Sequence, residues 1–207
     1  NVSFYNQTSD ENIEIPVFPT PTIGMLGIVE DKSHITSLSF NSEKDLIFLI
    51  GTSKNNISCS EYLTSFHKIK ESSTPEFCLD TEFKIQEAIK NLIRKNLIKS
   101  AHDVSDGGLF ICLIESCIDK NFGFHINGEK SIRDDAFLFG ESPSRIIVSV
   151  SKSKENNFVK YLESEKVDFR LIGSVTSGEI SYNDVSFGDI KDYKSLYENS
   201  LSDRMNS

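Results

Sequence analysis

The 207-residue sequence has no apolar run long enough to span a membrane, and its first residues carry no signal-peptide pattern. It also lacks an excess of basic residues, since 22 Lys and Arg stand against 31 Asp and Glu, a formal net charge of −9. Nucleic-acid binding needs clustered positive charge, which this balance argues against. We therefore expect a cytoplasmic protein with no nucleic acid and no membrane among its partners.

Cysteine is scarce and shows no metal-binding or redox spacing. None of the four cysteines forms a CxxC pair, and Cys112 and Cys117 lie in an apolar stretch with helical character. We interpret these two as packed thiols, which fits a reducing compartment. The P-loop pattern GxxxxGK[ST] is also missing, so any ATP site must be of another kind.

Hydrophobic periodicity predicts an alternation of strands and helices. Expected strands cover residues 23–29, 45–50, 134–139, 145–150, 169–175 and 180–187. Expected helices cover residues 60–69, 80–97, 108–118, 155–166 and 193–201. This order is typical of an α/β (α+β) fold in which helices cover a mixed sheet.

The most informative stretch is residues 100–109, Ser-Ala-His-Asp-Val-Ser-Asp-Gly-Gly-Leu. Asp106 is placed to accept from the first N–H groups of the following helix as its N-cap, and Gly107 and Gly108 allow a ligand to approach the backbone closely. Free N–H groups at a helix start suit phosphate oxygens. The carboxylates of Asp103 and Asp106 would repel a phosphate unless a Mg²⁺ ion lay between them and the phosphate. A capped helix start without any ligand is an equally good interpretation of these residues.

The segment 139–145, Phe-Gly-Glu-Ser-Pro-Ser-Arg, is a second candidate for ligand contacts. Arg145 fits a bidentate phosphate clamp, and it fits a structural pair with Glu141 equally well. His102 is more typical of a structural hydrogen-bonder beside a helix start than of a catalyst.

Five segments, taken in order, carry a resemblance to a known family. They are Asn-Val-Ser-Phe-Tyr-Asn at the start, residues 19–31, Ser-Glu-Tyr-Leu at 60–63, residues 100–109 and residues 138–148. This series resembles the C-terminal part of phosphoribosylformylglycinamidine synthase in its short bacterial form.

The resemblance implies an ATP-dependent ligase of de novo purine biosynthesis that converts formylglycinamide ribonucleotide, glutamine and ATP to the formylglycinamidine ribonucleotide. It implies the fold of the aminoimidazole-ribonucleotide-synthetase-like superfamily. Residues 1–31 would be the remnant of a second ATP-binding A domain, and residues 32–207 the second C-terminal-type B domain. Its partners would be the upstream half of the same synthetase, a separate glutaminase and a small accessory subunit. The chain is then expected to be a fragment that is inactive alone.

The resemblance also implies site residues and the cofactors Mg²⁺ and ATP or ADP. Asn1 and Asp103 would bind Mg²⁺, Ser3 the substrate, and Ser105 a second, structural nucleotide. The local chemistry adds Asp106, Gly107 and Gly108 to the nucleotide site. Further candidate ligand contacts are Glu141, Ser142, Arg145 and His102.

Two departures from the family pattern bear on these roles. Ser58 and Cys59 stand where the family usually has a glycine pair, and Phe110 replaces a small residue after the double glycine. A non-catalytic nucleotide-binding or scaffolding module therefore stays open as an alternative. So does a sister enzyme such as aminoimidazole ribonucleotide synthetase.

Overall fold

The computed structural model describes residues 7–10, 13–16 and 23–205, which fall into two compact units, Asn1–Lys32 and Ser33–Ser207. In the first unit, strands β1 (Gln7–Asp10) and β2 (Ile13–Pro16) pair antiparallel. The strand expected at residues 23–29 is wrong. Its apolar side chains are exposed, from 61% for Val29 to 101% for Leu26, and no strand in the described part of the chain pairs with this segment.

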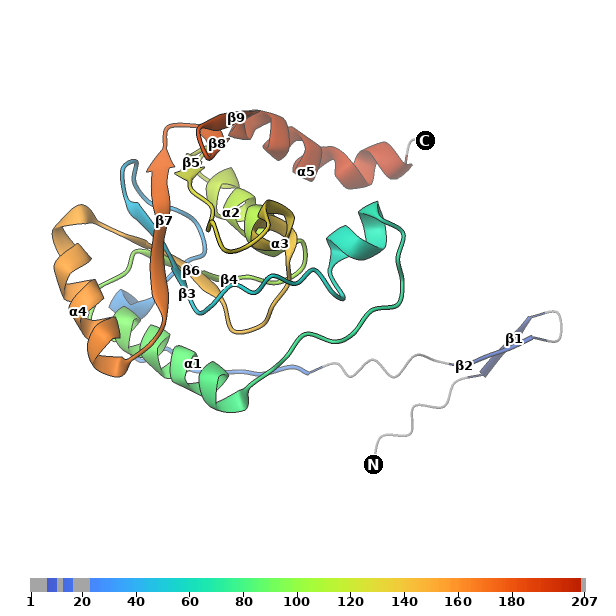
Figure 1. Cartoon of the computed structure of the whole chain (residues 1–207), viewed down its shortest axis with the longest axis horizontal. Coiled ribbons are helices and arrows are strands. Elements are labelled where there is room, and N and C mark those ends of the chain that lie inside the picture. Colours follow the sequence, from blue (N-terminus) through green and yellow to red (C-terminus); the bar gives the residue numbers. More distant parts are fainter. Residues whose placement is uncertain (1–6, 11–12, 17–22, 206–207) are drawn as a thin grey trace. The chain divides into compact units, whose positions relative to one another are not determined.

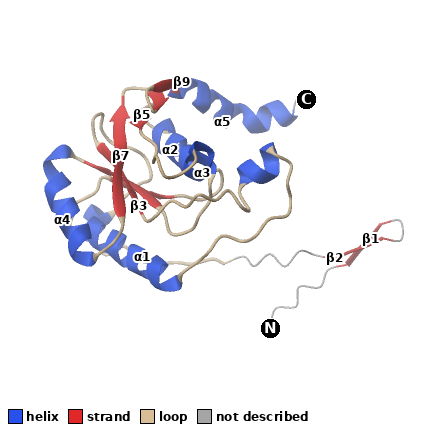
Figure 2. Ribbon diagram, viewed as in Figure 1, coloured by secondary structure: helices blue, strands red, loops and turns tan. Residues whose placement is uncertain are grey.

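The second unit is built on a seven-stranded mixed sheet (Figures 1 and 2). The strands lie in the order β4-β6-β3-β7-β5-β8-β9. All neighbouring pairs are antiparallel except β5 and β8, which are parallel. Their bounds are β3 Leu46–Ile50, β4 Ser100–Asp103, β5 Gly123–Ile126, β6 Ile146–Val150, β7 Phe169–Thr176, β8 Glu179–Tyr182 and β9 Val185–Asp189.

Helices cover both faces of this sheet (Figure 1). The helices α1 (Leu79–Arg94) and α4 (Glu155–Glu165) pack on one face, where Phe48, Leu92 and Phe158 belong to one buried cluster. The helices on the other face are α2 (Gly108–Ile118), α3 (Asp134–Phe139) and α5 (Ile190–Met205). Single turns occur at η1 Lys32–His34, η2 Tyr62–Phe66 and η3 Lys152–Lys154.

The side chains of helix α2 are apolar on almost every side, and the sheet, α3 and α5 enclose and bury them. Leu109 and Leu113 are fully buried in the second cluster, together with Phe124 and Ile172 from the strands beneath. None of the helices among the described residues is long and apolar enough to cross a membrane.

The α/β fold with a mixed, helix-covered sheet is confirmed. The strand expected at residues 134–139 is wrong, because the segment forms α3. Two acidic residues in the first turn favour a helix there, and Asp135 Oδ1 accepts from the Ala136 N–H at 2.8 Å. The strand expected at residues 180–187 is interrupted by a turn with positive φ at Asn183 and Asp184, which divides it into β8 and β9.

Candidate functional site

The turn between β4 and α2 carries the predicted nucleotide residues. The strand ends at Asp103, and the helix begins at Gly108 after Gly107, whose φ of 82° is left-handed. Gly108 also has a positive φ, and a Cβ there would lie 2.8 Å from Leu138 O and from the Phe139 backbone. Glycine is therefore required at Gly108 because α3 packs against the helix start, whatever ligand binds.

The side chain that caps this turn is Glu141, not Asp106, so the prediction that Asp106 forms the N-cap is wrong. The Gly107 N–H donates to Glu141 Oε1 at 2.8 Å, and the Glu61 N–H donates to the same oxygen at 2.7 Å. A carboxylate thus sits at the positive end of the helix, where an anion is favoured. Glu141 joins three segments that are far apart in the sequence.

The other polar side chains of the turn face solvent. Asp103, Ser105 and Asp106 are all exposed. No group of three or more His, Cys, Asp or Glu side chains gathers into a metal site within the described residues. Asp103 is one exposed carboxylate at the end of β4. Proteins often hold Mg²⁺ with one or two carboxylates together with phosphates and waters. Asn1 and Ser3 lie outside the described residues.

The loop that carries Glu141 is organised by Arg145. This side chain is only 2% exposed, and its guanidinium donates to the backbone carbonyls of Ser142 and Gly140. Burial lowers the pKa of Arg145 to about 10, and the carboxylate of Glu141 opposes that shift. Ser142 is buried in the same loop. In this structure Arg145 holds the loop in shape and is not presented to solvent.

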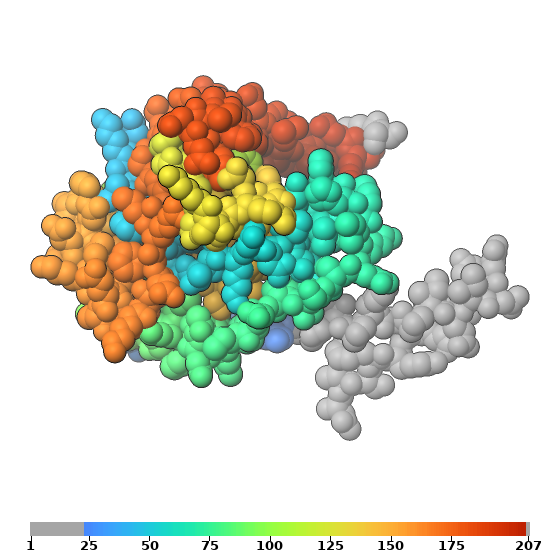
Figure 3. Space-filling model, in the orientation of Figure 1, coloured from blue at the N-terminus to red at the C-terminus, as the bar shows by residue number. Residues whose placement is uncertain are grey.

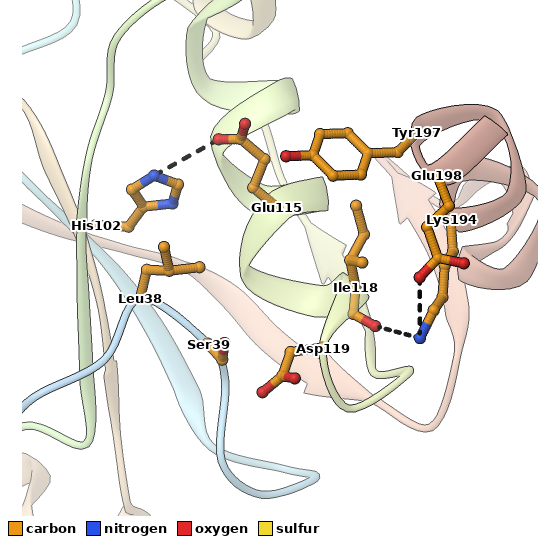
Figure 4. Close-up of a pocket in the computed structure, with 9 residues that line it drawn as sticks. All are labelled: Leu38, Ser39, His102, Glu115, Ile118, Asp119, Lys194, Tyr197 and Glu198. Atoms are coloured by element: carbon orange, nitrogen blue, oxygen red, sulfur yellow. Dashed lines mark hydrogen bonds and ion pairs between the residues drawn. The ribbon is translucent and has the colours of Figure 1, made fainter. Parts of the chain in front are cut away.

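His102 lines a cavity of about 370 Å³ between α2 and α5 (Figure 4), and no residue of the Asp103–Gly108 turn lines this cavity. Its Nδ1 lies 3.2 Å from both Cys112 O and Ser116 Oγ, and its Nε2 lies 3.5 Å from Glu115 Oε2. On the α5 side, Lys194 donates to Ile118 O. The ring of His102 therefore contacts residues of α2 other than those of the Asp103–Gly108 turn.

Sequence reasoning missed the role of Glu61. Its backbone N–H completes the Glu141 contact at the start of η2, where Ser60 Oγ also accepts from the Leu63 N–H at 3.1 Å. No local pattern could reveal a contact between residues 80 positions apart. The resemblance did single out Ser-Glu-Tyr-Leu at 60–63 as a segment, without giving it a role.

The sequence of the chain is similar to those of known proteins. The chain is 38% identical, over 87% of its length, to the phosphoribosylformylglycinamidine synthase subunit PurL of Thermoanaerobacter pseudethanolicus. It is 36% identical, over its whole length, to that of a Prochlorococcus marinus strain. It spans only 24% and 29% of these two relatives.

Solved structures agree at the level of the fold. The structure of T. maritima PurL complexed with FGAR matches 79% of this chain and 30% of its own, with a TM-score of 0.67 and 14% identity. A HypE-HypF complex matches 74% of this chain and 54% of its own, with a TM-score of 0.52 and 17% identity.

A family match covers the larger part of the second unit. The family described as "AIR synthase related protein, C-terminal domain" matches residues 43–184, which run from the turn before β3 to the turn after β8. This range contains the Asp103–Gly108 turn, Glu61 and Glu141. The chain belongs to the AIR synthase related, C-terminal domain family.

Proposed function

We propose that this chain is part of a phosphoribosylformylglycinamidine synthase and serves the formation of formylglycinamidine ribonucleotide in purine biosynthesis. The observation that carries the proposal is the 38% identity to a PurL subunit over 87% of the chain. The reaction would be that of an ATP-dependent ligase that uses glutamine as amide donor. The partners would be the rest of the synthetase, a glutaminase and an accessory subunit, in the cytoplasm.

We further propose that the Asp103–Gly108 turn binds the phosphates of ADP or ATP together with Mg²⁺. Asp103 at the end of β4 and Ser105 in the turn before α2 are both exposed, and Asp103 would hold the metal. The carboxylate of Glu141 accepts from Gly107 N, so a phosphate that takes this N–H must displace it. The same contact favours the alternative in which the turn is a capped helix start within a scaffolding module. Asn1 as a Mg²⁺ ligand and Ser3 as a substrate contact remain part of this proposal.

The activity is tested by grafting this chain into PurL of Thermoanaerobacter pseudethanolicus in place of the segment that it matches. The chimera is supplied with formylglycinamide ribonucleotide, ATP, Mg²⁺ and ammonia, because ammonia bypasses the glutaminase. We expect substrate-dependent release of ADP and phosphate. A folded chimera without turnover, beside an active parent enzyme, would contradict the proposed activity.

The nucleotide site is tested by isothermal titration of ADP with Mg²⁺ into the whole chain and into Asp103→Ala. We expect saturable binding that the variant loses. Glu141→Gln serves as the comparison, since its amide oxygen still accepts hydrogen bonds but its charge no longer opposes phosphate. Binding that persists unchanged in Asp103→Ala would place the nucleotide elsewhere.

A further inference from the structure

A second cavity, of about 390 Å³, lies at the end of β3 and the start of β7. Its lining includes Leu49 of β3 with Thr52 and Ser53 just after that strand, Glu129 from the loop after β5, and Asp168 and Arg170 around the start of β7. Figure 3 shows these three parts of the chain, in cyan, yellow and orange, adjoining on one face of the molecule. The cavity shares none of its lining residues with the Asp103–Gly108 turn or with the His102 cavity.

Two polar atoms of this cavity's lining residues, Ser53 Oγ and Arg170 Nη1, are buried without a hydrogen-bond partner among the described residues. Ser53 itself is 9% exposed. A buried hydroxyl in that state costs free energy unless something else satisfies it. Ser53 lines the cavity, so its hydroxyl can gain the missing hydrogen bond when the side chain turns toward a bound molecule.

The charged groups beside Ser53 lie close to one another. Arg170 Nη1 forms an ion pair with Glu129 Oε2 at 2.9 Å but no hydrogen bond, and Arg170 Nη2 donates to Gly128 O at 2.6 Å. Thr52 Oγ1 donates to Asp168 Oδ2 at 3.2 Å. Two carboxylates against one guanidinium leave a net negative charge, which disfavours a phosphate or carboxylate ligand.

The remaining hydrogen-bonding capacity selects a hydroxyl-bearing ligand. Carboxylate oxygens only accept and a guanidinium only donates, whereas each hydroxyl of a sugar does both. Two adjacent hydroxyls on a ligand could therefore meet Ser53 and a carboxylate together, as an acidic side chain meets a ribose in dinucleotide-binding folds. Leu49, 2% exposed, gives the cavity an apolar wall. The volume lies within the range of small-molecule sites.

We propose that the cavity lined by Ser53, Glu129 and Arg170 binds a neutral pentose ring through its vicinal hydroxyls. The ring could come from a free sugar or from a nucleoside. This site is additional to the function proposed above and does not depend on it.

The test is an NMR titration of the ¹⁵N-labelled whole chain with D-ribose, adenosine, 2′-deoxyadenosine and inorganic phosphate. We expect saturable amide shifts at Gly51, Ser53 and Gly128 with adenosine, and weaker binding of 2′-deoxyadenosine because one hydroxyl of the pair is missing. Saturation by ribose as well would identify the sugar alone as sufficient, while saturation by adenosine only would identify a nucleoside as the source.

Variants test whether Ser53 belongs to this site. Ser53→Ala should weaken adenosine binding about tenfold or more without lowering the thermal midpoint, since its Oγ has no partner to lose. Ser58→Ala, a nearby serine that does not line the cavity, should bind adenosine as the unaltered chain does. The proposal is overturned by no saturable shift with either sugar, by equal binding of the deoxy compound, by preferred binding of phosphate, or by full binding in Ser53→Ala.

Discussion

Gly108 shows how a residue can fit a ligand-binding pattern and still be fixed by packing. The double glycine indicated close approach of a ligand, yet backbone atoms of Leu138 and Phe139 occupy the space that a Cβ would need. The prediction that Asp106 forms the N-cap is wrong for a related reason. The carboxylate that accepts from Gly107 belongs to Glu141, 34 residues away. The sequence could predict a turn with N–H groups to satisfy, but not which side chain satisfies them.

Replacing Gly108 by alanine should lower the free energy of unfolding by about 2–5 kcal/mol. A left-handed residue with a side chain costs about 1–2 kcal/mol, and the overlap with the backbone of α3 adds about 1–3 kcal/mol. Gly188→Ala is the matched control, because its φ of 95° is also positive but the nearest atom outside its own segment is 3.8 Å away. Urea unfolding measures both. Equal losses would show that packing at Gly108 contributes nothing.

Glu141→Ala should destabilise the chain by about 1–2 kcal/mol, because two N–H groups lose a charged acceptor and water replaces it only partly. Glu141→Gln should keep most of this stability, since its side-chain oxygen still accepts from Gly107 and Glu61. Thermal unfolding of the three proteins gives the comparison. Wild-type stability in Glu141→Ala would contradict the role of this carboxylate as the cap.

Two of the four thiols should react quickly with Ellman's reagent in the folded chain. Cys59 and Cys78 are exposed, while Cys112 and Cys117 are buried, as the apolar helix predicted. Burial raises the pKa of both buried thiols well above the usual range. The pKa of Cys78 is lowered by hydrogen bonds from Thr81 at the start of α1. Cys78 should therefore react faster than Cys59 near neutral pH, and denaturant should expose all four.

Absorbance at 412 nm follows the reaction, with Cys78→Ser as the control that should remove the fastest phase. Rapid reaction of all four thiols without denaturant would contradict the buried position of α2.

Among the elements, those whose periodicity extends over several turns were predictable. The structure has α1, α2 and α4 close to the expected residues, as well as β3, β6 and β7. The strands β4 and β5 were missed because each has only four residues and includes a histidine and a serine or glycine. The helix α3 was taken for a strand because Ala136, Phe137 and Leu138 are buried in succession, a pattern that a short helix and a buried strand share.

The two ends of α1 should respond very differently to the same substitution. Leu92 is fully buried against the sheet and α4, whereas Leu79 is 71% exposed. Leu92→Ala should cost about 2–5 kcal/mol because it leaves a cavity. Leu79→Ala should change stability by no more than about 0.5 kcal/mol. Urea denaturation distinguishes them, and similar losses would contradict the packing of α1 on the sheet.

At the scale of the whole unit Ser33–Ser207, both hydrophobic clusters depend on the same strands. The side chains of Phe48 and Ile50 point to the α1 and α4 side, and those of Ile47 and Leu49 point to the α2 side. Because both clusters contain side chains of β3, neither cluster can unfold this strand while the other keeps it folded. The alternation of side chains in β3 therefore ties the two faces into one folding unit.

This unit should unfold in a single transition. Leu92→Ala in one cluster and Leu113→Ala in the other should each shift the entire thermal midpoint, whether it is followed by far-ultraviolet or near-ultraviolet circular dichroism. Coincident curves for the two probes are the expected result. A variant that splits the curve into two steps would show that the clusters unfold independently.

The position of β3 between β6 and β7 has a consequence for synthesis on the ribosome. This strand ends at Ile50, but its two partners begin only at Ile146 and Phe169. During translation β3 stays without its partner strands for on the order of ten seconds, because β6 and β7 have not yet been synthesised. Until then it is an unpaired, aggregation-prone strand, so the nascent chain should depend on chaperones far more than its final stability would indicate.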